Sequence, residues 1–299
     1  MKPTEYIWHN GEFVKWDDAK VHVLTHALHY GSGAFEGVRA YETDKGPAVF
    51  KLREHMERLV YSGEALAMKI PYTVDELCEN TLELIRKNKL KAAYIRPLVY
   101  YGYGVMGLNP KAAPVEAMLA CWEWGAYLGH EMVDIKTSSY VRIHPKSTIA
   151  DAKISGHYVN SIMAAIELYG TKYHEALLLD FEGNVAEGPG ENLFIIKDNK
   201  VYTPNLGKIL AGITRATVIQ YLKDENIELI EKVLTVDDIL TSDEAFYTGT
   251  AAEIQPIKSL DDKIIGSGET GPISAKVKEA YNLIVRGKIS KYNSYLSYA

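Results

Sequence analysis

The stretch Trp122-Glu123-Trp124-Gly125-Ala126-Tyr127-Leu128-Gly129 divides the chain into two folding regions. Its two glycines allow backbone flexibility, and its large aromatic side chains provide surfaces for packing. We therefore expect an interdomain connector here. The expected organisation is a small N-terminal domain over residues 1–123, an interdomain loop over 124–132 and a larger C-terminal domain over 133–299.

Upstream of the connector, the pattern predicts strands around two helices. Asn10-Gly11 between apolar flanks is a strong signal for a hairpin. Thr73 and Glu76 have the spacing of a capping box and predict the start of a helix that runs to about Asn88. The other predicted elements are a hairpin over 33–41 and 47–52, a helix over 53–68, and strands over 92–101 and 115–123.

Downstream of the connector, predicted strands and helices alternate. The turn Asp198-Asn199 separates two short strands, 192–197 and 201–203. The other predicted strands cover 133–143, 175–180 and 244–248, and the predicted helices cover 158–169, 213–223 and 274–286. The mixture predicts an α+β protein of two domains with a cleft between them.

Composition excludes several classes of protein. Hydrophobic residues make up 47% and charged residues 24%, the balance of a soluble globular protein. The net charge of −6 and the absence of a basic stripe argue against nucleic-acid binding. Cys78 and Cys121 are too few for a disulfide scaffold. No apolar run approaches 18 residues and the N-terminus lacks the apolar core of a signal peptide, so we expect no membrane span and a cytoplasmic location.

Two motifs resemble ligand sites but favour a structural interpretation. Gly102-Tyr103-Gly104-Val105-Met106-Gly107 fits a dinucleotide fingerprint, yet Pro110 follows, and no helix can start where the pyrophosphate would need one. We interpret it as a loop between strands. His22, His26 and His29 have the spacing of one helix face, but the apolar residues between them favour core or interface histidines, so we expect no metal.

Three segments have chemistry that the residues alone leave open. Tyr94 and Arg96 lie two apart in a strand and share a face, which suits either a carboxylate receptor or a buried arginine paired with an acid. Gly212 precedes a predicted helix N-terminus, a favourable place for a phosphate but also a common helix start. The small residues 248–252 suit anion binding or a plain turn, and composition does not distinguish Lys153 from the other lysines.

Eight short motifs then occur in one order along nearly the whole chain, from Tyr6 to about Gly287. They are His29-Tyr30-Gly31, Phe35-Glu36-Gly37-Val38-Arg39, Tyr94-Ile95-Arg96-Pro97, Trp124 to Gly129, Lys153 to Tyr158, Glu187-Gly188-Pro189-Gly190-Glu191-Asn192-Leu193-Phe194, Gly212-Ile213-Thr214-Arg215 and Gly249-Thr250-Ala251-Ala252-Glu253. In this order the chain resembles the branched-chain aminotransferases of the fold type IV class of pyridoxal-phosphate enzymes. The resemblance implies two α/β-type domains with the active site between them, the C-terminal one binding the cofactor.

The resemblance also implies how pyridoxal 5′-phosphate is held. Lys153 would form a Schiff base with the cofactor and later carry the proton to and from the substrate α-carbon. Glu187 would keep the pyridine nitrogen protonated, and Tyr158 would bind the phenolic oxygen of the ring. Arg58, Ile213, Thr214 and Thr250 would hold the phosphate. The remaining implied cofactor contacts are Leu210, Gly212 and Gly249.

The implied substrates are branched-chain L-amino acids (leucine, isoleucine and valine), glutamate and their 2-oxo acids. Tyr94 with the backbone of Thr250 and Ala251 would bind the α-carboxylate, and Arg96 the distal carboxylate of glutamate. Tyrosines suit this double use, because each presents an apolar ring with a polar tip. The other implied substrate residues are Tyr30, Phe35, Arg39, Tyr127 and Leu108. The resemblance places Leu108 at the tip of a loop that reaches into a partner subunit. A homodimer or an assembly of dimers is therefore expected.

The chain departs from the family pattern next to Lys153. Ser155 and His157 replace a glycine and an asparagine, which puts the breadth of substrates in doubt more than the type of reaction. D-amino-acid transaminases and aminodeoxychorismate lyases of the same fold remain alternatives. From other classes, a nicotinamide oxidoreductase and a non-catalytic binding module are less favoured.

Overall fold

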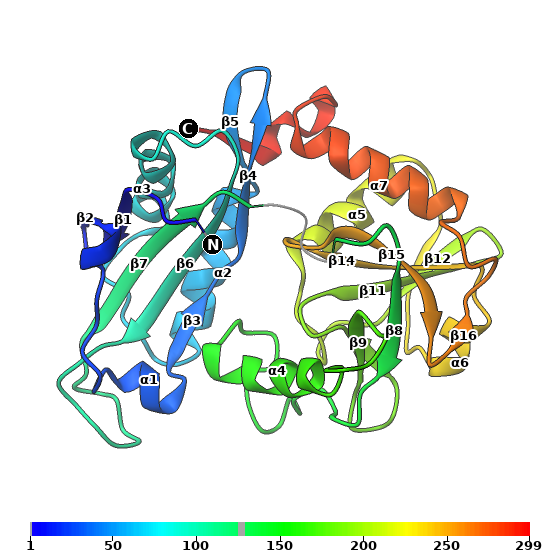
Figure 1. Ribbon diagram of the computed structural model, residues 1–299, viewed down its shortest axis with the longest axis horizontal. Coiled ribbons are helices and arrows are strands. Elements are labelled where there is room, and N and C mark those ends of the chain that lie inside the picture. Colours follow the sequence, from blue (N-terminus) through cyan, green and yellow to red (C-terminus); the bar gives the residue numbers. More distant parts are fainter. Residues whose placement is uncertain (1, 125–128) are drawn as a thin grey trace. The chain divides into compact units, whose positions relative to one another are not determined.

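A computed structural model describes residues 2–124 and 129–299 of the chain, which divides into two compact units. Unit 1 comprises Met1–Gly125, Ala152–His157 and Leu283–Ala299, and unit 2 comprises Ala126–Asp151 and Tyr158–Asn282. Each unit has its own β-sheet and helices, which confirms the α+β expectation (Figure 1). The units differ from the expected domain boundaries in two segments, because Ala152–His157 and Leu283–Ala299 pack with the N-terminal residues.

Unit 1 is built on an antiparallel sheet with the strand order β17-β5-β4-β6-β7-β1-β2, in which β3 also pairs with β6. Helices α2 and α3 pack against it around a buried core that includes Met56, Leu84 and Ile95 (Figure 1). The strands are β1 (Tyr6–His9), β2 (Glu12–Lys15), β3 (Gly33–Phe35), β4 (Val38–Thr43), β5 (Gly46–Phe50), β6 (Ala93–Tyr101), β7 (Val115–Trp122) and β17 (Leu296–Tyr298), and the helices are α1 (His26–Tyr30), α2 (Leu52–Glu64) and α3 (Val74–Lys87).

Unit 2 is built on a mixed sheet with the order β10-β9-β8-β15-β14-β11-β12-β13, in which β16 pairs with β15. The core side chains of this sheet include Ile135, Leu193 and Ile257. The strands are β8 (Val133–Thr137), β9 (Glu175–Leu179), β10 (Val185–Glu187), β11 (Asn192–Lys197), β12 (Lys200–Thr203), β13 (Leu229–Glu231), β14 (Glu244–Gly249), β15 (Glu253–Leu260) and β16 (Lys263–Ile264), and the helices are α4 (Tyr158–Ile166), α5 (Ile213–Asp224), α6 (Val236–Leu240) and α7 (Pro272–Val285), whose last turn belongs to unit 1.

Local signals set several of these elements. Asn10 and Gly11 adopt positive φ angles of 50° and 94° at the turn between β1 and β2, as a tight hairpin requires. The capping box is present: the Thr73 hydroxyl accepts the N–H of Glu76, and the Glu76 carboxylate accepts the N–H of Thr73. Both predictions are confirmed.

Several predicted boundaries were wrong; helix α4, predicted to reach residue 169, ends at Ile166. Helix α2 ends at Glu64, four residues early, because Gly63 accepts the N–H groups of Leu66 and Met68 and the chain turns through a left-handed Ala67. Strand β8 ends at Thr137. The predicted arm 33–41 is two strands, β3 and β4, interrupted at Glu36-Gly37.

Among the described residues, the helices are all too short or too polar to traverse a lipid bilayer.

Candidate active site

Lys153 lies in unit 1 on a short segment that is attached by its backbone to β3 and α2. Its N–H donates to Oγ of the buried Ser62 over 2.9 Å, and its carbonyl accepts the N–H of Phe35 over 3.1 Å. The next residue, Ile154, forms an antiparallel bridge with Ala34. The Lys153 amine lies 5.0 Å from the centre of the Phe35 ring. The main chain at Lys153 is therefore held on both sides.

Close backbone contact fixes the rest of this segment, which contains the two departures from the family pattern. Gly156 donates its N–H to the carbonyl of Gly31 over 3.0 Å, and a Cβ on Gly31 would lie 2.7 Å from Cα of Gly156. Ser155 fits because Gly33 faces it, since a Cβ on Gly33 would lie 3.0 Å from the Ser155 hydroxyl. His157 lies 3.3 Å through Nδ1 from the carbonyl of Ala152. Both replacements are therefore accommodated without displacing Lys153.

Tyr94, Arg96 and Phe35 form one cluster in unit 1. Nη2 of Arg96 donates to the Tyr94 hydroxyl over 2.9 Å, which confirms that the two side chains share a face of β6. The Arg96 guanidinium lies 4.8 Å from the centre of the Phe35 ring. Gly37 leaves room for this cluster, because a Cβ there would lie 2.3 Å from the Tyr94 hydroxyl. Trp124 stacks on Tyr94 at 4.6 Å. The arrangement presents a guanidinium and a hydroxyl beside aromatic surface.

Glu36, His55 and Arg58 form a buried charged group in unit 1. Arg58 donates to Oε1 of Glu36 through Nε over 2.6 Å and to Oε2 through Nη2 over 2.9 Å, and Nδ1 of His55 lies 2.7 Å from Oε2. Burial would raise the pKa of Glu36, but Arg58 and His55 outweigh it and hold that pKa well below its usual range. Burial lowers the pKa of His55. Arg58 is thus a fixed cation on α2.

Three further expected substrate residues lie on unit 1, where Arg39 pairs with Tyr94 between β4 and β6. The Arg39 guanidinium lies 4.9 Å from the ring of Tyr41. Tyr30 is partly exposed on α1, and Leu108 is 88% exposed in the loop between β6 and β7. That loop contains Gly102 to Gly107 and no helix, so its interpretation as a loop between strands is confirmed. Tyr127 lies outside the described residues.

In unit 2, the Glu187 carboxylate is surrounded by hydrogen-bond donors. Oε1 accepts Nε of Arg142 over 2.5 Å, and Oε2 accepts Nδ2 of Asn192 over 3.0 Å. The backbone N–H of Leu210 lies 3.2 and 3.1 Å from the two oxygens. Glu187 itself is 5% exposed. Because all of these groups donate, the surroundings favour the ionised carboxylate.

The loop after Leu210 leads into the N-terminus of α5. Asn192 also donates to the Leu210 carbonyl over 2.9 Å, and a Cβ on Gly212 would meet Oδ1 of Asn192 at 1.9 Å, so only glycine fits there. Gly212 is the N-cap of α5 and makes no side-chain cap hydrogen bond. Ile213 and Thr214 form the first turn. Uncapped N–H groups at the start of a twelve-residue helix favour an anion.

The turn between β14 and β15 supplies the remaining expected residues. Thr250 and Ala251 lie in this turn, directly after Gly249. Gly249 approaches the backbone of Gly190, because a Cβ on Gly249 would lie 3.2 Å from the Gly190 carbonyl oxygen. Thr248 is buried, and its hydroxyl has no hydrogen-bond partner within residues 2–124 and 129–299. Tyr158 is the first residue of α4.

The sequence predictions did not include Arg142, Asn192 and Ser62 as site residues. The chain has only eight arginines among its 33 basic residues, so each arginine could have been examined as a partner for a carboxylate. The contact of Ser62 with Lys153 joins residues 91 positions apart and leaves no local pattern, whereas Asn192 lies only five positions from Glu187 in the same motif.

The histidine motif is only partly helical. Helix α1 begins at His26, so His22 is not on it and the three histidines do not share one helix face. His26 lies 2.6 Å from Oγ of Ser32 and 2.8 Å from the carbonyl of Gly107, and His29 lies 2.9 Å from the carbonyl of Val23. These contacts agree with a structural use of the histidines.

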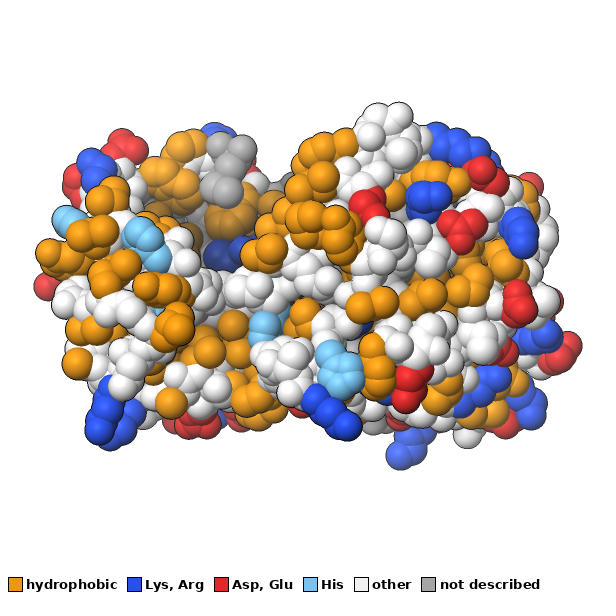
Figure 2. Space-filling view, turned by 90° about the horizontal axis from the view of Figure 1, so that it is seen from below, with side chains coloured by type: hydrophobic (Ala, Val, Ile, Leu, Met, Phe, Trp, Pro, Cys, Tyr) orange, Lys and Arg blue, Asp and Glu red, His pale blue; other side chains and the backbone are white. Residues whose placement is uncertain are grey.

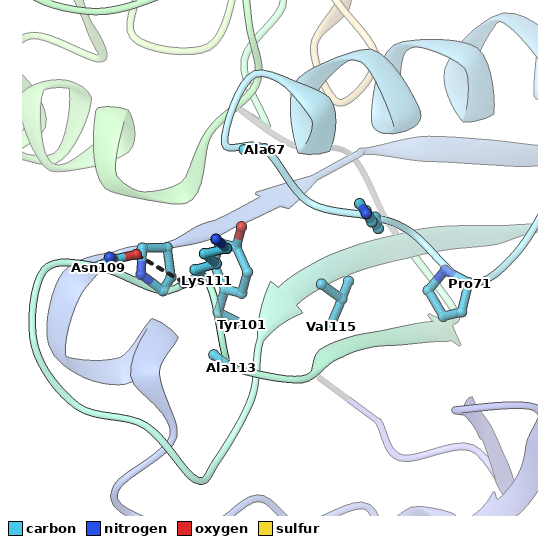
Figure 3. Close-up of a pocket in the computed structure, with 9 residues that line it drawn as sticks. Ala67, Pro71, Tyr101, Asn109, Lys111, Ala113 and Val115 are labelled. Atoms are coloured by element: carbon cyan, nitrogen blue, oxygen red, sulfur yellow. Dashed lines mark hydrogen bonds between the residues drawn. The ribbon is translucent and has the colours of Figure 1, made fainter.

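A groove of about 590 Å³ opens on unit 1 beside the loop between β6 and β7 (Figure 3). Its lining residues include Tyr101, Ala113 and Val115, together with Lys69 and Lys111. None of its lining residues is an expected site residue.

Comparisons with known proteins agree with one another. The family model "Amino-transferase class IV" matches residues 33–260. The chain is 47% identical over 286 residues to a branched-chain-amino-acid aminotransferase of Pseudomonas aeruginosa, covering 94% of this chain and 93% of that relative. It is similar to the crystal structure of a T.th. branched-chain amino acid aminotransferase complexed with N-(5′-phosphopyridoxyl)-L-glutamate, with a TM-score of 0.96, 44% identity and coverage of 99% and 98%. The form with pyridoxamine 5′-phosphate gives a TM-score of 0.97, 44% identity and coverage of 100% and 99%.

Proposed function

The chain belongs to the branched-chain aminotransferases of amino-transferase class IV, with the fold type IV architecture. On that premise we propose roles for the candidate site residues of unit 1 and unit 2. It is a transferase that depends on pyridoxal 5′-phosphate and exchanges an amino group between branched-chain L-amino acids and 2-oxoglutarate. The D-amino-acid transaminase and aminodeoxychorismate lyase alternatives are not favoured. The observation that carries the residue assignment is the backbone of Lys153, fixed between Ser62 and Phe35.

The residues of unit 2 suit the cofactor's phosphate and ring nitrogen. Uncapped N–H groups of Ile213 and Thr214 at the start of α5 supply donors for a phosphate, and Gly212 gives close access to the backbone. Thr250 adds a hydroxyl from the β14–β15 turn, and Arg58 of unit 1 adds a positive charge. Leu210 and Gly249 complete the proposed contacts, and Tyr158 binds the phenolic oxygen.

Glu187 serves the pyridine nitrogen. When bound, the cofactor supplies a protonated ring that withdraws electron density from the substrate α-carbon. A carboxylate surrounded by Arg142, Asn192 and Leu210 donors stays ionised, and an ionised carboxylate holds a proton on the nitrogen that it faces.

Lys153 carries the cofactor and moves the proton at the substrate α-carbon. A lysine amine can do both, because it is a nucleophile toward aldehydes and, once released, a base. Because the main chain of Lys153 is fixed, its side chain can reach only a limited region. This keeps the amine close to the substrate α-carbon.

The Tyr94 cluster explains how one site takes two kinds of side chain. Tyr94 with the backbone of Thr250 and Ala251 binds the α-carboxylate that all substrates share. Phe35 offers apolar surface to leucine, isoleucine or valine, and the Arg96 guanidinium beside it binds the distal carboxylate of glutamate. Tyr30, Arg39 and Tyr127 complete the proposed pocket.

We also propose a homodimer, or an assembly of dimers, in which Leu108 of one subunit reaches the pocket of its partner. The support is an apolar patch on unit 1, where hydrophobic and histidine side chains gather over α1 and the nearby loop (Figure 2). Leu108, Val23 and Leu28 are 88%, 73% and 64% exposed. Contacts of His26 with the carbonyls of Gly102 and Gly107 hold the two parts of the patch together. Exposed apolar surface of this kind marks interfaces between proteins.

The cytoplasmic location of the protein stays a prediction.

A visible spectrum tests the function. Purified protein is expected to lose the visible absorbance of its lysine-bound cofactor when L-leucine or L-glutamate is added, and to keep it with D-alanine. Conversion of D-alanine alone would contradict the assignment.

A further inference from the structure

Arg142 connects three parts of unit 2. Its Nε donates to Oε1 of Glu187 over 2.5 Å, and its Nη2 donates to the carbonyl of Ala150 over 3.1 Å. Its own N–H donates to the carbonyl of Leu179 at the end of β9 over 2.7 Å. The side chains of Arg142 and Glu187 are only 11% and 6% exposed. The ion pair is therefore fixed at its backbone and at both ends of the guanidinium.

The charge balance at Glu187 depends on this arginine. A carboxylate removed from water is driven toward its neutral acid unless a positive charge or several donors compensate. Asn192 and Leu210 donate without carrying charge, whereas Arg142 brings a full positive charge into contact with the carboxylate. If Glu187 became a neutral acid, it would share its proton with a ring nitrogen that then carries no charge.

We propose that Arg142 is a positioning residue for transamination: its guanidinium keeps the Glu187 carboxylate ionised and oriented, and thereby keeps the proton on the pyridine nitrogen of the cofactor. The inference rests on the role of Glu187 in the proposed function. The second contact, to Ala150, orients the guanidinium at the start of the short stretch of chain that leads to Lys153. Lysine could supply the charge but not both directed hydrogen bonds.

The test measures the protonation state of the pyridine nitrogen of the cofactor directly. Protein is reconstituted with pyridoxal 5′-phosphate labelled with ¹⁵N in the ring, and the ¹⁵N resonance is followed with pH in the wild type, Arg142→Gln and Arg142→Met. We expect a pyridinium resonance in the wild type and a shift toward neutral pyridine in both variants. We also expect kcat to fall by roughly tenfold to a hundredfold, the range found when a partner that orients a site ligand is removed. The methionine variant fills similar space if the glutamine variant fails to fold.

Arg215→Gln is the matched control. Arg215 also lies in unit 2, and its Nη2 donates both to Glu231 over 2.5 Å and to the carbonyl of Pro204 over 3.0 Å. Its loss breaks another arginine–glutamate ion pair of unit 2, one with a more exposed carboxylate, and should leave the pyridinium resonance unchanged. Arg142→Lys should recover part of the pyridinium signal that the glutamine variant loses.

The outcomes separate the two proposals. A pyridinium resonance that persists in the Arg142 variants but disappears in Glu187→Gln would overturn the role of Arg142 and leave that of Glu187. A pyridinium resonance that persists in Glu187→Gln would overturn the proposed function of Glu187 and this inference with it. Equal shifts in the Arg142 and Arg215 variants would assign the effect to general loss of ion pairs and would also overturn the inference.

Discussion

The backbone N–H of Lys153 donates to Oγ of Ser62, 2.9 Å away on α2. The two residues are 91 positions apart in the chain, and the serine is fully buried. On its other side, the Lys153 carbonyl accepts the N–H of Phe35. Helix α2 and strand β3 of unit 1 thus fix the main chain of Lys153 and the point from which its side chain extends.

Ser62→Ala should weaken the attachment of Lys153. The substitution leaves the N–H of Lys153 without its acceptor, and an unsatisfied buried donor costs about 1–3 kcal/mol. We expect a lower unfolding midpoint in urea and a higher dissociation constant for pyridoxal 5′-phosphate. Thr81→Val is the control, since its buried hydroxyl donates to the Leu77 carbonyl within α3, away from Lys153 in the chain. Equal cofactor affinity in Ser62→Ala and the wild type would show that the hydrogen bond does not position the lysine.

Arg96→Met should separate the two classes of substrate. The change removes the guanidinium beside Phe35 and the hydrogen bond to Tyr94, but leaves apolar volume. Loss of a charged partner costs about 1.5–3 kcal/mol, so the KM for glutamate should rise more than about tenfold. Leucine makes no use of the charge, and its half-reaction should change much less. Single-turnover kinetics with each amino acid measure this, and equal losses for both would remove Arg96 from its role in specificity.

Glu175 predicts a pH dependence of stability. Burial raises the pKa of this carboxyl to about 7, although the N–H of Ala176 lowers it in part. The folded protein therefore binds a proton at Glu175 that the unfolded chain has released above its ordinary pKa of 4.5. The sign follows: stability from this group is complete below pH 4.5 and is lost as the pH rises through about 7.

Glu175→Gln should remove this dependence. Relative to the wild type, the variant should gain up to about 2–3 kcal/mol in free energy of unfolding between pH 5 and pH 8.5. Urea unfolding at the two pH values measures the difference. The exposed Glu269→Gln is the control and should show no such gain. A constant difference across the pH range would mean that Glu175 titrates normally.

Local pattern predicted most of the fold, and long-range packing set what it missed. The hairpin at Asn10-Gly11 and the capping box at Thr73 follow from a few neighbouring residues, so both could be predicted. Strand β15 was not predicted, because Pro256 lies inside it and a central strand rarely contains proline. The pairing of Tyr94 with Arg96 followed from strand period.

Charged partners were harder to predict. Glu36 and Arg58 are 22 positions apart and Arg142 and Glu187 are 45 apart, and no spacing rule connects residues over such distances. The motif order along the chain indicated the family, but not which groups orient its carboxylates and cations.

The most direct test of the whole account is the site of covalent attachment. Holoenzyme treated with borohydride and digested should yield one pyridoxyl-labelled peptide, with the label on Lys153. Lys153→Ala should keep its fold, lose the label and lose activity, while Lys136→Ala, in strand β8, should keep the label and the activity. A label on another lysine, no label at all, or near-normal turnover in Lys153→Ala would contradict the account.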